Sequence, residues 1–220
     1  MPPNPKPSAR KTSATASARV AFPVVAMAAS VGGLKALSAI LSVLPADFPA
    51  AIAIVMHLSP DHDSVLAEIL DRRTLLVVKK AHTGDVLCQS FVFVAPPNHH
   101  LFVADSGRLE LSSSSAEKAH YARPSAEPLF ASVAAVYRKN AIAVVLTGGD
   151  GDGSFGVQII KNQGGRVIAQ DRPTSEDFSM PKTAIETGDV DFILPLDKIG
   201  PKLIELVGAL VQMSRSNTVQ

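Results

Sequence analysis

Three reactive side chains follow three apolar segments of the sequence. Ser30 and His57 each come directly after an apolar run, and Asp152 lies in the Gly/Asp-rich segment that follows a third run, residues 141–146. A hydroxyl, an imidazole and a carboxylate are the groups that nucleophilic acyl transfer needs: a nucleophile, a general base and an acid that orients the base. The residue types therefore indicate ester or amide hydrolysis, provided that the fold brings them together.

Each of these residues also has a purely structural explanation. Serine is a common helix N-cap, so Ser30 could serve only to begin the following helix. His57 could be a half-buried, hydrogen-bonded residue, and Asp152 could cap the helix after its turn. A phosphate-binding loop at Gly32 and Gly33 is disfavoured, because neither the Rossmann spacing nor a P-loop lysine is present.

Metal and thiol chemistry are also disfavoured. Asp150, Asp152 and Ser154 have the one-three-five spacing of a calcium loop, but the sixth position is Phe155 rather than glycine and the twelfth is Lys161 rather than glutamate. The histidines at 99, 100 and 120 could form a metal cluster, but 99 and 100 are adjacent, so their rings point apart, and this pair is expected to be on the surface of a turn. The single cysteine, at position 88, is expected to be a small, partly buried residue. We therefore expect no metal and no organic cofactor.

The elements that position these residues alternate along the chain. Short apolar strands separated by amphipathic helices predict an α/β fold: a doubly wound, mostly parallel sheet with helices on both faces and an antiparallel β-hairpin. In such sheets ligands and catalytic groups gather at the carboxyl ends of the strands. Predicted strands cover 23–29, 50–56, 75–78, 141–146, 166–169 and 191–194, with hairpin strands at 91–95, 101–103 and 109–111. Predicted helices cover 34–44, 61–70, 128–139, 154–162, 180–186 and 198–212.

Composition limits the domain organisation and the partners. Of the 220 residues, 46% are hydrophobic and the net charge is +1, which predicts one globular domain and gives no electrostatic case for nucleic acid or membrane binding. We expect a disordered basic tail at 1–20, a catalytic domain at 21–213 and a frayed C-terminus at 214–220. A lone cysteine and the lack of an apolar run of spanning length favour a cytoplasmic protein.

Several ordered segments together resemble the catalytic domain of the CheB-type protein-glutamate methylesterases of bacterial chemotaxis. Residues 28–33 (AASVGG) resemble the nucleophile turn of that family, and residues 146–153 (LTGGDGDG) resemble its acid turn. The resemblance extends over roughly residues 23–207. The other matching segments are 55–62, 94–101, 123–125 with 129–130, 169–171 and 180–181.

This resemblance implies a serine hydrolase that removes methyl esters from glutamate side chains of chemoreceptors, with glutamine deamidation as a second activity. It implies Ser30 as nucleophile, His57 as general base and Asp152 as orienting acid. Backbone amides near Val31 and Gly149 are the candidates for the oxyanion site. The implied partner is a methylated chemoreceptor or a receptor-like signalling protein, with neither nucleic acid nor membrane insertion involved.

The sequence departs from the family pattern in ways that leave alternatives open. Val31 stands where the family often has threonine, and Gly149 and Asp150 replace a methionine and a glycine. Asp150 places a second carboxylate two residues from Asp152 and could compete for His57. Family members often carry a receiver domain, whereas about twenty residues precede the first strand here, so phosphorylation control is expected either to come from a separate regulatory partner or to be absent. A catalytically weak binding module and an esterase for small molecules remain alternatives.

Overall fold

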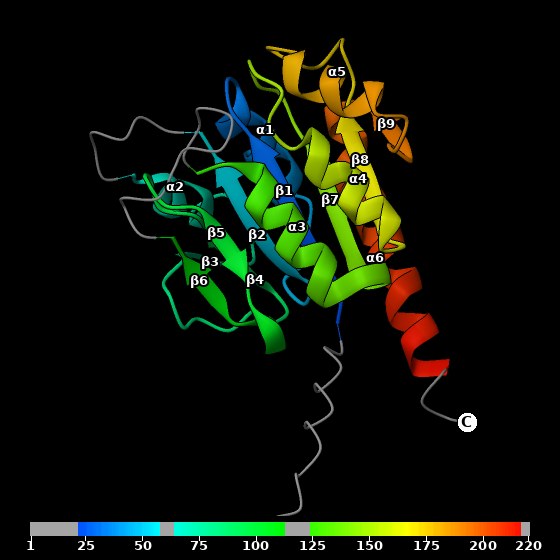
Figure 1. The fold of residues 1–220 in the computed structure, drawn as a ribbon. Helices are drawn as coiled ribbons and strands as arrows, with labels where there is room; N and C mark the ends of the chain where they lie inside the picture. Colours follow the sequence, from blue (N-terminus) through cyan, green and yellow to red (C-terminus); the bar gives the residue numbers. More distant parts are fainter. Residues whose placement is uncertain (1–21, 58–63, 113–123, 217–220) are drawn as a thin grey trace, which may run out of the picture.

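A seven-stranded parallel sheet forms the centre of the computed structural model, which describes residues 22–57, 64–112 and 124–216 (Figure 1). The strand order is β3-β4-β2-β1-β7-β8-β9, and every neighbouring pair is parallel. The strands are β1 (Val24–Ala29), β2 (Ala51–Met56), β3 (Val77–Lys80), β4 (Phe91–Val94), β7 (Ala141–Val145), β8 (Arg166–Gln170) and β9 (Phe192–Leu194).

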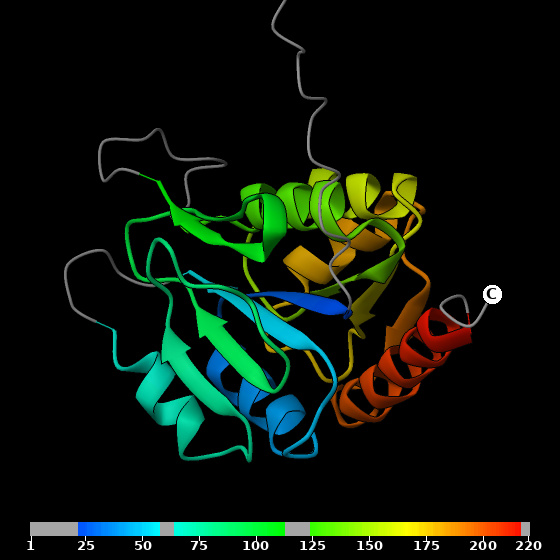
Figure 2. The same ribbon diagram turned by 90° about the horizontal axis from the view of Figure 1, so that it is seen from below.

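Helices cover both faces of this sheet, as Figure 2 shows. One face carries α1 (Gly33–Leu41), α2 (Leu66–Asp71) and α6 (Leu196–Ser216). The other carries α3 (Ala126–Tyr137), α4 (Ser154–Asn162) and α5 (Ser179–Glu186), together with the two-stranded sheet of β5 (Leu101–Val103) and β6 (Leu109–Leu111). Two short 3-10 turns lie at Asp105–Gly107 and Arg138–Asn140. The prediction of a doubly wound α/β fold is confirmed.

The alternation of side chains along the strands builds two separate cores. In β1, Val24, Ala26 and Ala28 belong to the core under α3 and α4, whereas Val25 and Met27 belong to the core under α1 and α6. All six residues of β1 are buried. A strand that is apolar on both faces is typical of the middle of a parallel sheet, and this explains why the apolar runs of the sequence are continuous rather than alternating.

The chain reverses its winding direction at β1. From β1 the order runs through β2 to β4 and β3 on one side, and through β7 to β8 and β9 on the other. The crevice outside the carboxyl ends of the strands at such a switch point is the usual place for a ligand in an open α/β sheet. The segments that follow β2, β1 and β7 carry His57, Ser30 and Asp152, so the three predicted site residues follow three adjacent strands.

The predicted hairpin is correct in part. Strands β5 and β6 form an antiparallel pair in which Leu101 faces Leu111. The prediction of a hairpin strand at 91–95 is wrong. This segment forms β4, which lies inside the parallel sheet between β3 and β2. Val92 and Phe93 are buried on opposite faces of the sheet, in the two different cores. Burial on both faces, rather than the polar turn that follows, decides the placement of this strand.

Several helix ends differ from their predicted positions. Helix α3 begins at Ala126 rather than at Pro128, because the Ser125 hydroxyl caps it and a proline is tolerated in the first turn. Helix α6 runs to Ser216 rather than ending at 212, so residues 214–216 are helical where we expected fraying. Helix α2 begins at Leu66, after the N-cap residue Val65, rather than at 61 as predicted. The segments 1–21, 58–63 and 217–220 lie outside the described residues. No helix in the described part of the chain is both long and apolar enough to cross a membrane.

Candidate active site

Ser30 lies directly after β1, in a turn that leads into α1. Its backbone N–H donates to the carbonyl of Thr147 (2.9 Å), and its own carbonyl accepts from the N–H of Gly33 (2.9 Å). Gly32, with a φ of 76°, occupies the N-cap position of α1. Ser30 is therefore not the cap of this helix, which excludes the structural explanation. Its hydroxyl makes no hydrogen bond to another described residue.

The absence of a side chain at Gly148 lets the Ser30 turn approach the acid turn. A Cβ atom on Gly148 would lie 2.9 Å from Cβ of Ser30 and 2.1 Å from Sδ of Met180. Neither contact is possible without displacement of the neighbouring atoms. Met180 is fully buried. Gly148 thus keeps the candidate nucleophile next to the segment that carries the candidate acid.

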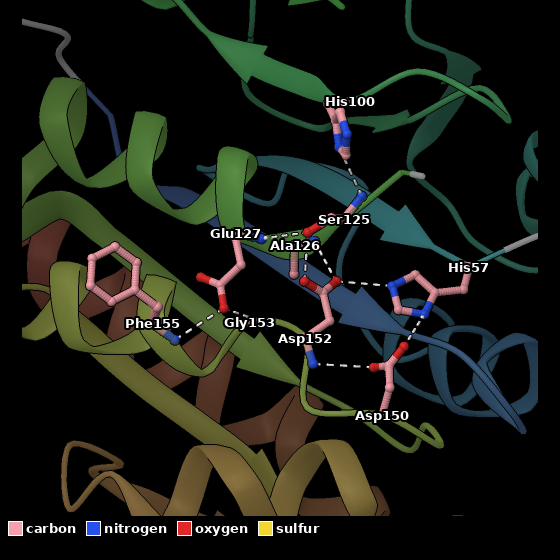
Figure 3. Close-up of polar contacts among 9 residues, drawn as sticks. All are labelled: His57, His100, Ser125, Ala126, Glu127, Asp150, Asp152, Gly153 and Phe155. Carbon is pink, nitrogen blue, oxygen red and sulfur yellow. Dashed lines mark hydrogen bonds and ion pairs between the residues drawn. The ribbon is translucent and has the colours of Figure 1, made fainter. Parts of the chain in front are cut away.

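His57 lies between two carboxylates (Figure 3). Its backbone N–H donates to the carbonyl of Ala29 (3.1 Å), which extends the pairing of β2 with β1 by one residue. The ring Nε2 lies 2.9 Å from Oδ2 of Asp152, and the ring Nδ1 lies 3.1 Å from Oδ2 of Asp150. The predicted pair of His57 and Asp152 is therefore formed. The second carboxylate occupies the other ring nitrogen.

The two carboxylates make His57 strongly basic. Burial of the ring lowers the pKa of His57, but the hydrogen bonds and negative charges of Asp150 and Asp152 outweigh this effect and raise the pKa to about 9. The ordinary value is 6.5. In this arrangement the ring is an imidazolium at neutral pH, with both N–H groups donating to carboxylates.

Asp152 is held by the N-terminus of α3 as well as by His57. Its side chain is fully buried. Oδ1 accepts from the Ser125 hydroxyl (2.6 Å), and Oδ2 accepts from the backbone N–H of Ala126 (2.5 Å). The Ser125 N–H in turn donates to Nδ1 of His100 (3.3 Å). A buried carboxylate with this many donors is fixed in position, which suits a residue that orients a histidine.

Glu127 makes the reciprocal contact with the N-terminus of α4. Its Oε1 accepts from the N–H groups of Gly153 and Phe155 (3.0 Å each), and its Oε2 accepts from the N–H of Gly156. Gly153 is the N-cap residue of α4 and offers no side-chain cap. Glu127 therefore satisfies amides that the helix itself leaves unpaired, and its negative charge is favourable at the positive end of the helix dipole.

We predict that Glu127→Gln lowers the free energy of unfolding by about 1.5–3 kcal/mol, because an amide group cannot accept all three backbone bonds and carries no charge. Urea denaturation monitored by circular dichroism measures the change. Glu186→Gln is the matched control, since Glu186 makes only an exposed i,i+4 pair with Lys182 and should change stability by less than about 0.5 kcal/mol. Equal effects of the two substitutions would contradict a structural role for Glu127.

A pocket with a volume of about 460 Å³ opens beside Ser30. His57 is not among its lining residues, so the pocket extends from Ser30 toward α1 rather than toward the histidine. Lys35 and Arg73 contribute positive charge to this pocket, and Glu176 contributes negative charge. The remaining lining residues are Ser30, Gly32, Gly33, Leu34, Ser38 and Met56. A short substrate side chain that reaches Ser30 has room on this side.

The two oxyanion candidates lie near each other. A Cβ atom on Gly149 would lie 4.0 Å from Cγ2 of Val31, and within the described residues neither backbone N–H has a hydrogen-bond partner. Val31 is 49% exposed. Both amides are therefore available to a ligand at the Ser30 turn, and their role stays a prediction.

The alternative metal and thiol groups are engaged elsewhere. Nδ1 of His99 pairs with the carbonyl of Pro97 (2.8 Å), and His120 lies outside the described residues. The expected surface position is wrong for His100, which is buried, and its Nδ1 accepts from the N–H of Ser125. Burial raises the pKa of the Cys88 thiol, which disfavours the reactive thiolate.

Comparison with known proteins identifies the family. The family model described as CheB methylesterase matches residues 25–203. The chain belongs to the CheB methylesterase family. The crystal structure of the Thermotoga maritima CheB methylesterase catalytic domain has a TM-score of 0.81 and 39% sequence identity, and the match covers 86% of this chain and 100% of that one. The resemblance seen in the sequence is confirmed.

Curated CheB relatives are longer than this chain. A Pyrococcus horikoshii protein is 38% identical over 200 residues, which are 90% of this chain and 54% of the relative. An Anaeromyxobacter dehalogenans protein is 42% identical over 183 residues, which are 83% of this chain and 53% of the relative. Both are named protein-glutamate methylesterase/protein-glutamine glutaminase. The chain thus spans about half the length of the curated CheB relatives that it matches.

The sequence did not indicate the residues that hold Asp152 and the N-terminus of α4. Ser125 carried a detectable signal, since a serine after a proline and before an apolar run is typical of an N-cap. Its hydrogen bond to Asp152 spans 27 residues of sequence and had no local signal. Glu127 was visible only as an acidic residue near the start of a helix, and its partners are on α4.

Proposed function

We propose that the chain is a protein-glutamate methylesterase that uses Ser30 as nucleophile, His57 as general base and Asp152 as orienting acid. One observation carries this proposal: the three residues follow the adjacent strands β1, β2 and β7, and His57 Nε2 is hydrogen-bonded to the buried Asp152. The names of the curated CheB relatives support the choice of methyl esters, and of glutamine side chains as a second substrate.

The first step is attack of the Ser30 hydroxyl on the γ-carbonyl carbon of a glutamyl methyl ester. Asp152 holds Nε2 of His57, so Nδ1 is the ring nitrogen that takes the serine proton. The buried Asp152 carboxylate then stabilises the imidazolium. The negative charge on the carbonyl oxygen is placed near the amides of Val31 and Gly149, at the N-terminus of α1, where it is favoured.

The second half of the cycle returns the enzyme to its starting state. The imidazolium donates its proton to the methoxy oxygen, methanol leaves, and the glutamyl group remains as an ester on Ser30. His57 then takes a proton from water as the water attacks this ester. Collapse of the intermediate returns the proton to the serine oxygen and releases the glutamate side chain. With a glutamine substrate ammonia replaces methanol, and neither route needs a metal or an organic cofactor.

The substrate that we propose is a methylated chemoreceptor or a receptor-like signalling protein. We place the reaction in the cytoplasm, the reducing compartment that a lone cysteine favours.

The proposal is tested by methanol release from chemoreceptor membranes that carry labelled methyl esters. We expect release that is saturable in receptor, and turnover of simple methyl esters that is slower by orders of magnitude. A folded protein that releases no methanol from the receptor but hydrolyses simple esters would be a small-molecule esterase instead.

A second candidate function is a regulatory binding module that keeps the fold but turns over slowly. The contact of Asp150 with Nδ1 of His57 favours it, because the nitrogen that must take the serine proton is already engaged. A fluorophosphonate probe distinguishes the two functions without knowledge of the substrate. Labelling of the wild type at Ser30 supports the enzyme, and no labelling at any pH supports the binding module.

A further inference from the structure

His57 has two carboxylate partners that differ in how firmly each is held. Asp152 is fully buried and accepts from Ser125 and Ala126 in addition to His57. Asp150 is 39% exposed, and its second oxygen, Oδ1, accepts from the N–H of Asp152 (3.1 Å). Because solvent reaches Asp150 and not Asp152, Asp150 is the carboxylate that can exchange its contact with the ring for water.

The number of protons on the imidazole ring determines whether His57 can act as a base. Ionised carboxylates only accept hydrogen bonds, so a ring that contacts a carboxylate at each nitrogen carries a proton on both. Such a ring cannot take the proton of Ser30. One proton must leave Nδ1 for solvent, and the carboxylate at Nδ1 must move aside, before Ser30 can donate to that nitrogen.

The geometry points to Asp150 as an inhibitory carboxylate: it occupies the nitrogen of His57 that the nucleophile needs, and its displacement precedes attack on the ester. This inference rests on the proposed function, because it takes Ser30 and His57 as the reacting pair. Both carboxylates contact the imidazole ring of His57. Asp152 orients the ring for catalysis, whereas Asp150 slows attack by Ser30 as long as it stays at Nδ1. A substrate that draws Asp150 away from the ring would relieve the inhibition when it binds.

The charged groups around His57 determine the pH dependence. Asp150 and Asp152, both in the turn between β7 and α4, are the charged groups with which the ring interacts among the described residues. From β1 and from the start of α3 the neighbouring residues, Ser30 and Ser125, are uncharged. Asp177, before α5, interacts electrostatically with Asp150 and not with the ring. Since the pKa of His57 is raised to about 9, about 1% of the rings are neutral at pH 7.

The test is the rate at which a fluorophosphonate probe labels Ser30 between pH 6 and pH 10. We expect the wild-type rate to rise with pH to a midpoint near 9. Asp150→Asn keeps the size of the side chain and removes its charge, and Asp150→Gly removes the contact. Both should shift the midpoint downward by at least about one unit and raise the labelling rate at pH 7 by about tenfold.

The control is Asp177→Asn, which removes a nearby negative charge without removing a contact of His57, and should leave the midpoint close to that of the wild type. The inference is overturned if both Asp150 variants fold but keep the wild-type midpoint, if they label more slowly at pH 7, or if no protein is labelled at any pH. Methanol release is measured separately. Faster labelling of the variants without methanol release from any protein would retain the inhibitory carboxylate and refute the methyl ester substrate.

Discussion

Replacement of Ser30 by alanine should reduce methanol release from methylated receptor by at least about 10³-fold. The substitution removes the atom that forms the acyl-enzyme while leaving the backbone contacts of the turn, the N–H to Thr147 and the carbonyl to Gly33, in place. Because the hydroxyl has no hydrogen-bond partner among the described residues, its loss leaves no buried group unsatisfied. The large loss of activity should therefore come without a loss of stability.

The matched control for this prediction is Ser42→Ala. Ser42 follows α1, and its hydroxyl donates to the carbonyl of Ala39 at an exposed site, so activity should stay within about twofold. Mass spectrometry after fluorophosphonate treatment should find one adduct on wild type and none on the Ser30 variant. Activity that survives in Ser30→Ala would remove this residue from the reaction and leave the fold without an assigned nucleophile.

The sequence was sufficient for the parts of the site that depend on local pattern. Continuous apolar runs identified β1, β2 and β7 as buried strands, and the switch-point rule then placed the residues after them at one edge of the sheet. His57 and Asp152 are 95 residues apart, yet each is found because it follows a strand. The same local logic failed for β4, because both of its partners, β3 and β2, precede it in the chain and run parallel to it, whereas the polar turn after it suggested an antiparallel partner that follows.

The contacts among the side chains of His57, Asp150 and Asp152 could not be predicted, because they depend on the backbone dihedral angles of the turns that carry these residues. The sequence placed Asp150 two residues from Asp152 and left open whether it helps or competes. The structure shows where Asp150 lies: its Oδ1 accepts from the N–H of Asp152, and its Oδ2 contacts Nδ1 of His57. A bond of this kind between an aspartate and a backbone amide two residues later is common in turns. Its catalytic consequence depends on where β2 places the histidine.

The second large effect is expected for Asp152→Asn, which should lower kcat/KM for methylated receptor by about 10³–10⁴-fold. An asparagine can keep its oxygen toward Ala126 and His57, with its amide group toward Ser125. The geometry then survives, but the negative charge that stabilises the imidazolium in the transition state is lost. Because this charge acts on the chemical step, kcat should fall while KM stays within a few-fold of the wild type.

Asp150→Asn provides the sharpest comparison, because it makes the same chemical change on the opposite side of the same ring. Asp152 lies on Nε2 and orients the base, whereas Asp150 lies on Nδ1 and occupies the position that Ser30 needs. The two substitutions should therefore have effects of opposite sign at pH 7, a large loss for Asp152→Asn and a gain of about tenfold for Asp150→Asn. If Asp150→Asn proves the more damaging change, Asp150 is the orienting acid. Ser30 would then have to donate its proton to Nε2, and the imidazole ring would have to rotate to present this nitrogen to the serine.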